Sequence, residues 1–270
     1  MPMDALTLGF VARELKEALV GGRVDKVGQP ERDELIVSVR NHGRNLALLL
    51  TANAGTARAH LTTRRQSNPL EPPMLCMLAR KHLIGGRVSD VRQMLGDRIL
   101  EIDVENISDL GDPTVRTIVC EFMGKHSNLM LINAEGKIID SARHVTQDVS
   151  RVREVLPGLP YERPPLQEKL PYDELSETAL IPALSGKSGP AARALTEAVT
   201  GLSRQTAREI ALRMTGEEDG DASLLEPGRV SAFFASLPSL ASPRLVSAED
   251  GRPLDVTAFP YRIYASLPQQ

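Results

Sequence analysis

The stretch LVGGRVDKVGQ at residues 19–29 decides the fold, because it recurs 64 positions later as LIGGRVSDVRQ at residues 83–93. An ungapped alignment of residues 19–39 with residues 83–103 has eight identities in 21 positions, the glycine pair among them. Ahead of each copy, apolar residues recur at the spacing of an amphipathic helix, over residues 4–20 and 74–83. The glycine pair ends each predicted helix, as a C-cap does. We therefore predict two similar units, each with a helix, a short strand, a turn and a longer strand.

The second copy continues into a predicted meander of strands over residues 114–123, 129–133 and 137–142. Because only two copies exist, we expect them to pack around one pseudo-twofold axis and not to form a solenoid. The sequence thus predicts an α+β fold, a duplicated two-layer β-sandwich or squashed barrel with a helix from each copy against it.

Five prolines between residues 155 and 171 indicate a linker or an extended lashing segment, and we place a domain boundary there. The predicted first domain covers residues 1–170 and a small helical domain covers residues 171–238. The tail, residues 240–270, is predicted to form a hairpin around Asp250-Gly251 and a final strand, with a return to the first sheet as one option.

Two short helices are predicted in the second domain, in PAARALTEAV from Pro190 and RQTAREIALRM from Arg204. A turn at Gly201 joins them, which fits a helix-hairpin-helix unit. Such a turn exposes N–H groups beside the positive end of the second helix, where a phosphate can bind, so Gly201, Ser203 and Arg204 are candidate RNA contacts. A plain helical hairpin is the alternative.

The chain has 270 residues, 41% of them hydrophobic and 25% charged, with a formal net charge of -3, which excludes disorder as its main state. No run of 18 apolar residues is present, so we expect no membrane span. The N-terminus lacks the basic segment of a secretory signal, and the two cysteines form no disulfide framework. We therefore expect a reducing, cytoplasmic location.

The charges are unevenly distributed. Residues 51–100 carry eight basic and three acidic side chains, a net charge of +5, whereas residues 101–150 carry four basic and nine acidic ones, a net charge of -5. A local basic patch on a weakly acidic body favours a selective reader of RNA or DNA. The alternative is a solvated helix face whose charges pair within the molecule.

Motifs of catalysis are not found in the sequence. It has no phosphate-binding loop of the type GxxxxGK[ST] or GxGxxG, no GxSxG nucleophile elbow, and no histidines or cysteines at zinc-ligand spacing. We therefore predict a protein that is not an enzyme and needs no cofactor or metal.

Polar residues interrupt apolar strand contexts at three places: Asp97-Arg98 at the mouth of a strand, the turn from Glu121 to Asn128, and the basic step Arg80-Lys81-His82. An aspartate next to an arginine offers both an acceptor and a forked donor, which suits contacts to base edges. A local salt bridge that fixes the turn is the alternative.

Several collinear blocks resemble the NFACT family, in particular its bacterial RqcH or FbpA-type branch, which is related to eukaryotic NEMF. The blocks are MPMDALTLGFVARELK, LVGGRVDKVGQP, ARAHLT, PPMLCMLARKHLIGGRV, GDRILEI, EFMGKHSNLMLI, IIDSARHV and SRVREVLPG. The resemblance covers essentially all 270 residues. The resemblance implies an N-terminal NFACT-N domain, similar in fold to the N-terminal domain of Fpg/MutM-type DNA glycosylases, followed by a helix-hairpin-helix domain.

The resemblance also implies a function in ribosome quality control. Family members of this type bind large ribosomal subunits obstructed by peptidyl-tRNA, recruit alanyl-tRNA and promote template-free alanine tailing of the stalled chain. The family's Asp-Arg motif falls on Asp97 and Arg98, and its Glu-Ile-Met motif falls on residues 121–123. The implied tRNA-binding residues are Asp97, Arg98, Glu121, Phe122, Met123, Gly124 and Lys125, with Arg80 and Lys81 as additional candidates.

Phe122 departs from the family's isoleucine, and an aromatic ring there could stack on a base or fill the core. Family members also continue into a coiled coil and an NFACT-R domain, so we expect this chain to correspond to their N-terminal part, with ribosome anchoring mainly outside it.

Two other functions were weighed. A DNA glycosylase/lyase would use the amine of Pro2 as nucleophile, but no glutamate follows it and no zinc finger is present. A fibronectin-binding adhesin is the older description of the family, and the lack of an export signal argues against it.

Overall fold

The structure is a computed structural model that describes residues 3–64, 66–94, 96–108, 111–165 and 167–270. The chain folds into two compact units. The first unit comprises residue 3 and residues 11–94 and 98–165, and the second comprises residues 4–10, 96–97 and 167–270, within the described ranges. No helix in these ranges is both long and apolar enough to cross a membrane.

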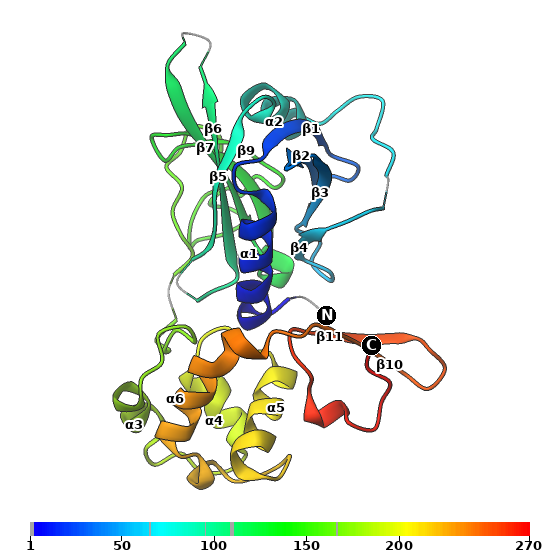
Figure 1. Ribbon diagram of the computed structural model, residues 1–270. Coiled ribbons are helices and arrows are strands. Elements are labelled where there is room, and N and C mark those ends of the chain that lie inside the picture. Colours follow the sequence, from blue (N-terminus) through cyan, green and yellow to red (C-terminus); the bar gives the residue numbers. More distant parts are fainter. Residues whose placement is uncertain (1–2, 65, 95, 109–110, 166) are drawn as a thin grey trace. The chain divides into compact units, whose positions relative to one another are not determined.

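An antiparallel sheet of nine strands forms the first unit, together with helix α2 and the larger part of helix α1 (Figure 1). The strand order is β4-β3-β2-β1-β5-β6-β7-β8-β9. The bounds are α1 Ala5–Leu19, β1 Arg23–Gly28, β2 Glu34–Asn41, β3 Arg44–Thr51, β4 Arg58–Leu61, α2 Met74–Leu83, β5 Arg87–Gln93, β6 Ile99–Ile107, β7 Pro113–Glu121, β8 Asn128–Ile132 and β9 Ile138–Ser141.

The two sequence copies meet where β1 and β5 pair, at Arg23 and Arg87. Hydrogen bonds are exchanged reciprocally there: Gly21 N donates to Val88 O (2.8 Å) and Gly85 N donates to Val24 O (2.9 Å). Gly21 and Gly85 end the two helices with φ of 83° and 87°, a conformation that glycine adopts without strain.

Strands β2 and β6 each provide an asparagine with the same role in its copy, although the two asparagines are one position out of step with the sequence alignment. The Asn41 amide donates to the carbonyl oxygens of Ala18 and Val20, and the Asn106 amide donates to those of His82 and Ile84. Each asparagine thereby binds the last turn of the helix of its own copy, where carbonyl groups lack partners within the helix.

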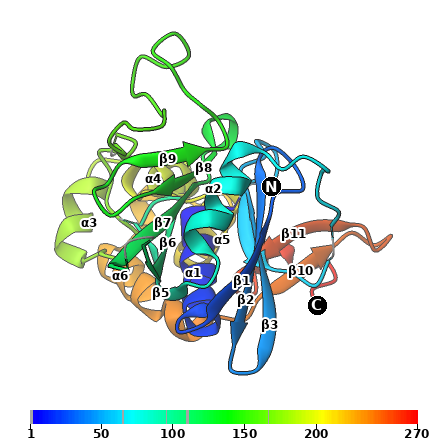
Figure 2. The same cartoon turned by 90° about the horizontal axis from the view of Figure 1, so that it is seen from above.

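The nine strands form one hydrogen-bonded series, which does not fit a sandwich of two separate sheets, whereas the other predicted arrangement, a squashed barrel, also consists of one continuous sheet. Helix α2 packs against β1, β6 and β9, although β9 is the edge strand, so the sheet curves around this helix (Figure 2). The pairing of β1 with β5 joins the two halves and removes the free edge that each would present as a separate sheet.

The segment that follows β9, which includes the start of the proline-rich stretch, packs against the sheet. We call residues 145–163 the strap. Within it, Val145 and Val155 exchange hydrogen bonds, and its later part lies along β9, where Ile138 N donates to Leu159 O (2.9 Å). A small apolar cluster lies beneath it, made of Ile99, Val119, Met130, Ile132, Ile138 and Val155, with Met123 and Tyr161 packed against it.

The second unit is helical and has a separate hairpin of two strands. Its elements are α3 Glu177–Leu184, α4 Ala191–Ala198, α5 Arg204–Thr215, α6 Pro227–Ser236, β10 Arg244–Ser247 and β11 Pro253–Thr257. Its core joins Leu6 and the faces of these helices with Phe259 and Tyr261. The predicted hairpin is present, but β10 pairs with β11 and not with the nine-stranded sheet, so the optional return of the tail is not seen in the described residues.

Candidate nucleic-acid interface

The two segments marked by the sequence meet at one end of the β6–β7 pair. Ile99 is opposite Glu121 in the register of these strands. One step further, Phe122 N donates to the carbonyl oxygen of Arg98 (2.9 Å). Strand pairing thus brings Arg98 beside residues 121–123, which lie more than 20 positions away in the sequence.

Glu121 is buried at this end, with 0% of its surface exposed. Its carboxylate accepts hydrogen bonds from the Arg153 guanidinium and from the Tyr161 hydroxyl (2.9 Å), both in the strap. Burial raises the pKa of Tyr161, and the negative charge of Glu121 raises it further, so the hydroxyl remains a donor. Glu121 therefore anchors the strap and does not face solvent.

Phe122 is also fully buried, which decides between its two predicted roles in favour of filling the core. Met123 is half-buried and packs against the apolar cluster under the strap. A direct RNA contact predicted for Glu121 or Phe122 does not fit their inward placement, because neither side chain reaches the surface in this conformation. They can support an interface only by holding the residues that follow them.

A short loop, residues 124–128, follows and does reach the surface. Gly124 has φ of 58° and begins a single 3₁₀ turn, which ends where Ser127 N donates to Gly124 O (3.0 Å). Lys125 and His126 in this turn are exposed. Within the part of the chain that the structure describes, the Lys125 ammonium has no carboxylate partner. The loop thus presents an uncompensated positive charge.

Sequence reasoning missed the residue that ties this loop to the rest of the first unit. The Arg143 guanidinium, in the segment after β9, donates to the carbonyl oxygen of Lys125 (3.1 Å) and lies 3.4 Å from a carboxylate oxygen of Asp33. The Asn128 side-chain amide accepts a hydrogen bond from Arg143 N (3.0 Å) and donates one to Arg143 O (2.8 Å). The sequence signals for Arg143 are its place in the block IIDSARHV and its position two residues after a strand, and neither points to this contact.

Asp97 and Arg98 belong to different units. Asp97, in the second unit, is 9% exposed, and Arg98, in the first, is half-buried. Each has interaction partners in the structure. Within the first unit, the hydrogen bond from Phe122 N to Arg98 O holds the backbone of Arg98 beside Phe122, two residues before the start of the 124–128 loop.

The basic step at the end of α2 is not brought to this site. Arg80 donates through Nε to the carbonyl oxygen of Val27 (2.9 Å), which occupies it within the protein, while Lys81 is exposed. Asn106 binds the end of α2 at the far end of β6, whereas Arg98 precedes the near end. Along a nine-residue strand these ends are about 26 Å apart.

The candidate turn of the second unit is occupied by the protein itself. Helices α4 and α5 form where predicted, and Ser203 caps α5 by accepting a hydrogen bond from Thr206 N (3.1 Å). The carboxylate of Asp4 accepts from Ser203 N (3.0 Å) and from the Thr206 hydroxyl (2.5 Å). An acid therefore fills the position predicted for a phosphate, and the helix-hairpin-helix interpretation as an open anion site is corrected.

Gly201 and Arg204 complete this turn. The carbonyl oxygen of Gly201 accepts a hydrogen bond from Ala5 N (2.9 Å), and a Cβ atom at Gly201 would lie 2.2 Å from the Cβ of Ala5. Glycine is therefore required by close packing against the start of α1. Arg204 is exposed in the first turn of α5.

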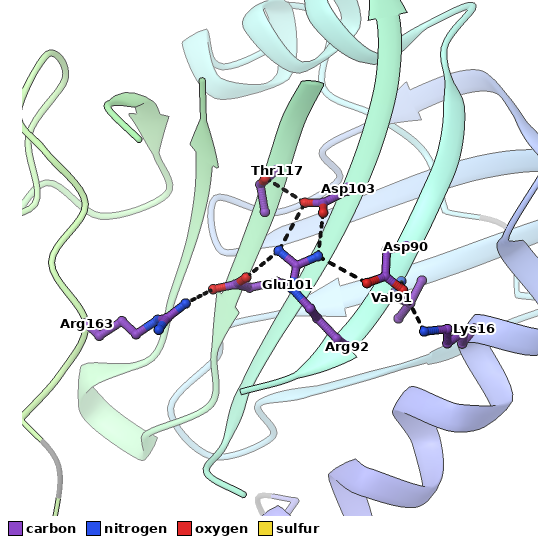
Figure 3. A network of polar contacts seen from close by, with 8 residues as sticks. All are labelled: Lys16, Asp90, Val91, Arg92, Glu101, Asp103, Thr117 and Arg163. Atoms are coloured by element: carbon purple, nitrogen blue, oxygen red, sulfur yellow. Dashed lines mark hydrogen bonds and ion pairs between the residues drawn. The ribbon is translucent and has the colours of Figure 1, made fainter. Parts of the chain in front are cut away.

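One arginine of the segment predicted as a basic patch, Arg92, is paired within the first unit. Figure 3 shows Arg92 surrounded by three carboxylates, of which Glu101 lies 2.6 Å and Asp90 3.3 Å away and Asp103 is hydrogen-bonded. The bonds to Asp103 raise the pKa of Arg92. At either end of the network, Lys16 binds Asp90 (2.8 Å) and Arg163 of the strap contacts Glu101 (3.4 Å). These basic side chains form ion pairs within the first unit, whereas Lys125 is an exposed cation outside this network.

Two further candidates were sought. Among the described residues, no group of three histidine, cysteine, aspartate or glutamate side chains could hold a metal ion. Pro2, whose amine the lyase alternative requires, lies outside the residues that the structure describes.

Comparison with known proteins identifies related chains. The model of the family "NFACT N-terminal and middle domains" matches residues 4–267. A protein named Rqc2 homolog RqcH from Bacillus subtilis (strain 168) is 37% identical over 210 residues, 77% of this chain and 37% of that protein. Its namesake in Streptococcus suis (strain 05ZYH33) is 34% identical over 249 residues, 90% of this chain and 45% of that protein. The chain thus spans less than half the length of these curated relatives.

A solved structure agrees over almost the whole chain. It is the N-terminal part of the fibronectin/fibrinogen-binding protein of Streptococcus suis, with a TM-score of 0.82 and 31% identity, covering 96% of this chain and 91% of that one. The fibrinogen-binding protein of Staphylococcus aureus gives a TM-score of 0.81 with 28% identity, over 98% of this chain and 92% of that one.

Proposed function

This chain belongs to the NFACT family, and on that premise we propose that it acts in ribosome quality control as a tRNA-binding adaptor. It binds alanyl-tRNA on large ribosomal subunits obstructed by peptidyl-tRNA, and so supports template-free addition of alanine to the stalled chain. It works in the cytoplasm, where ribosomes are, and as a binding protein and not as an enzyme. The names of the curated relatives, Rqc2 homolog RqcH, support this role.

One observation supports the assignment of the surface: the hydrogen bond from Phe122 N to Arg98 O holds Arg98 beside the segment that leads into the 124–128 loop. In this proposal the Lys125 ammonium binds a tRNA phosphate, and Asp97 with Arg98 reads base edges. Met123 and Gly124 shape the loop, while Glu121 and Phe122 hold it from inside.

The other candidates have smaller parts in the proposal. Lys81 and Arg204 are exposed and remain proposed additional contacts. Arg80, Gly201 and Ser203 are engaged within the protein, so we assign them structural roles.

The test compares two lysines that lie at opposite ends of β8. Lys125 precedes this strand, and Lys137, which is also exposed and has the same charge, follows it in the hairpin to β9. We expect Lys125→Ala to weaken binding of tRNA(Ala) about tenfold and to lower the slope of log K against log salt by about one counterion. Lys137→Ala should leave affinity and slope unchanged. Equal effects of the two substitutions would contradict the assigned surface.

Base reading is tested separately with the double variant Asp97→Ala/Arg98→Ala. Loss of a base-edge pair should reduce the discrimination between tRNA(Ala) and other tRNAs by roughly 1–3 kcal/mol. Competition binding with a second tRNA measures this, and unchanged selectivity would refute the reading role.

The other two functions are not favoured. The similar solved structures are of proteins named for binding fibronectin or fibrinogen. An adhesin requires surface exposure on intact cells, which antibody labelling of unpermeabilised cells measures. The lyase requires a covalent adduct through Pro2, which borohydride trapping with an abasic-site oligonucleotide would detect.

A further inference from the structure

The segment after β9 joins two parts of the first unit that are distant in the strand order. The Arg143 guanidinium lies 3.4 Å from Asp33, which precedes β2, and 3.4 Å from the carbonyl oxygen of Ala52, which follows β3. Asp33 and Ala52 are neighbours, because Ala52 N donates to Asp33 O (2.8 Å). On its other side the guanidinium donates to the carbonyl oxygen of Lys125 (3.1 Å).

The backbone of Arg143 is fixed independently of its side chain. Asn128 accepts from Arg143 N and donates to Arg143 O, and the Ser141 hydroxyl donates to the same carbonyl oxygen (2.9 Å). The guanidinium therefore projects from an anchored backbone. Its planar fork of donors can serve several acceptors at once, which the single ammonium of a lysine cannot do in the same geometry.

The negative charge of Asp33 helps to hold the Arg143 guanidinium in the position from which it donates to the carbonyl oxygen of Lys125. Its carboxylate is 21% exposed and the Arg143 side chain 35% exposed, so the pair is only partly screened by water. Asp33 neutralises Arg143 and holds it against the loop backbone, whereas the Lys125 ammonium has no such partner in the described ranges. The first sequence copy thus supplies the acid that orders a loop of the second copy.

We infer that Arg143 is a positioning residue, which, held by Asp33, fixes the 124–128 loop in the conformation that presents Lys125 to tRNA. This inference rests on the proposed function for its tRNA part. Its structural part, the fixing of the loop, can be measured without RNA. Arg143 acts through the carbonyl of Lys125 and does not itself need to touch tRNA.

Hydrogen–deuterium exchange of the free 270-residue protein tests the structural part. Arg143→Ala should speed exchange at the amides of His126 and Ser127 roughly tenfold, the equivalent of one net hydrogen bond. Asp33→Asn keeps the shape of the side chain and removes its charge, so it should give the same direction of change with less risk of misfolding. Arg143→Lys should resemble Arg143→Ala, because the fork is lost.

The matched control is Arg116→Ala. Arg116 is a half-buried arginine of β7 whose guanidinium, among the described residues, bonds only to Thr114 and Val115, one and two positions before it in the sequence. Its removal should leave exchange in the 124–128 loop unchanged. Denaturant midpoints of all variants identify any general loss of stability, which would speed exchange throughout the first unit and not in this loop alone.

Binding of tRNA(Ala) tests the functional part. Arg143→Ala should weaken binding about three- to tenfold, but add little in a Lys125→Ala background, because both substitutions remove the same contact. If Lys125→Ala weakens binding and Arg143→Ala changes neither exchange nor affinity, the inference is overturned and the proposed function stands. If Lys125→Ala has no effect, the proposed surface is overturned, and with it the tRNA role of Arg143. Additive effects also overturn the inference.

Discussion

Two places in this protein were predicted to bind a nucleic acid through positively charged or N–H groups. They differ in whether a carboxylate of the protein itself occupies those groups. At the turn before α5, the carboxylate of Asp4 binds Ser203 N and the Thr206 hydroxyl. At the end of β7, the carboxylate of Glu121 is turned inward to Arg153 and Tyr161, and among the residues that the structure describes the Lys125 ammonium has no carboxylate partner. The comparison teaches that a helix N-terminus or a basic turn is open to a ligand only where no carboxylate of the same chain already occupies it.

The largest expected effect comes from breaking the inward pair at β7. Arg153→Met leaves Glu121 buried without its charge partner, since Glu121 is 0% and the Arg153 side chain 14% exposed. We expect a loss of about 3–5 kcal/mol in the free energy of unfolding of the first unit. Urea denaturation measures it.

The double variant Glu121→Gln/Arg153→Met is the control for this prediction. It removes both charges and keeps an acceptor for the Tyr161 hydroxyl, so it should regain much of the lost stability. A double variant that is as unstable as Arg153→Met would contradict the account of Glu121 as a buried anchor.

The next effect concerns the acid at the other place. Asp4 caps two helices, because it accepts from Thr7 N (2.9 Å) at the start of α1 as well as from Ser203 N at the start of α5. Asp4→Ala should therefore destabilise the second unit by about 2 kcal/mol. Thermal denaturation with a probe in α5 would record this. Stability equal to that of the unmodified protein would show that Asp4 does not occupy the helix end.

A smaller effect contrasts the surface cations of the two places. Arg204→Ala, at the turn filled by Asp4, should change the affinity for tRNA(Ala) less than about twofold, whereas Lys125→Ala should weaken it about tenfold. Filter binding at two salt concentrations measures both. The reverse order would place the main contact on α5.

The smallest effect is a titration in the second unit, at the ion pairs that Glu197 forms with two basic side chains. Lys187 and Arg193 donate to Glu197 and lower its pKa to about 2. Because the folded pKa is depressed, this pairing is complete above the unfolded pKa of about 4.3 and is lost as the pH falls through about 2. NMR titration should give that midpoint, and Lys187→Ala should raise it. An ordinary midpoint would mean that these cations are available to other anions.

Local sequence patterns predicted most helices and strands, because apolar residues recur along each of them with the period of a helix or of a strand. The helix over residues 4–20 is α1 at Ala5–Leu19, and the strand predicted at 114–123 is β7 at Pro113–Glu121. The glycine pairs marked both helix ends because a left-handed C-cap needs glycine. The order of the nine strands in the sheet was not predicted, because alternation along a strand does not say which strand lies beside it.

The parts of the site that depended on distant partners could not be predicted. Asp4 and Ser203 are 199 positions apart, and Arg143 and Asp33 are 110 positions apart. No local pattern reports such pairs, so the turn at Gly201 resembled an open phosphate site and Arg143 had no assigned role. The inward placement of Glu121 and Phe122 likewise depends on the strap that covers them.

Mapping the tRNA-bound surface tests the central claim most directly. Hydrogen–deuterium exchange of the protein with and without tRNA(Ala) reports which amides the RNA covers. The account predicts slower exchange in residues 123–126 and around Arg98, with no change in residues 203–206, where Asp4 already binds. Protection centred on residues 203–206, with the loop at Lys125 unaffected, would contradict it.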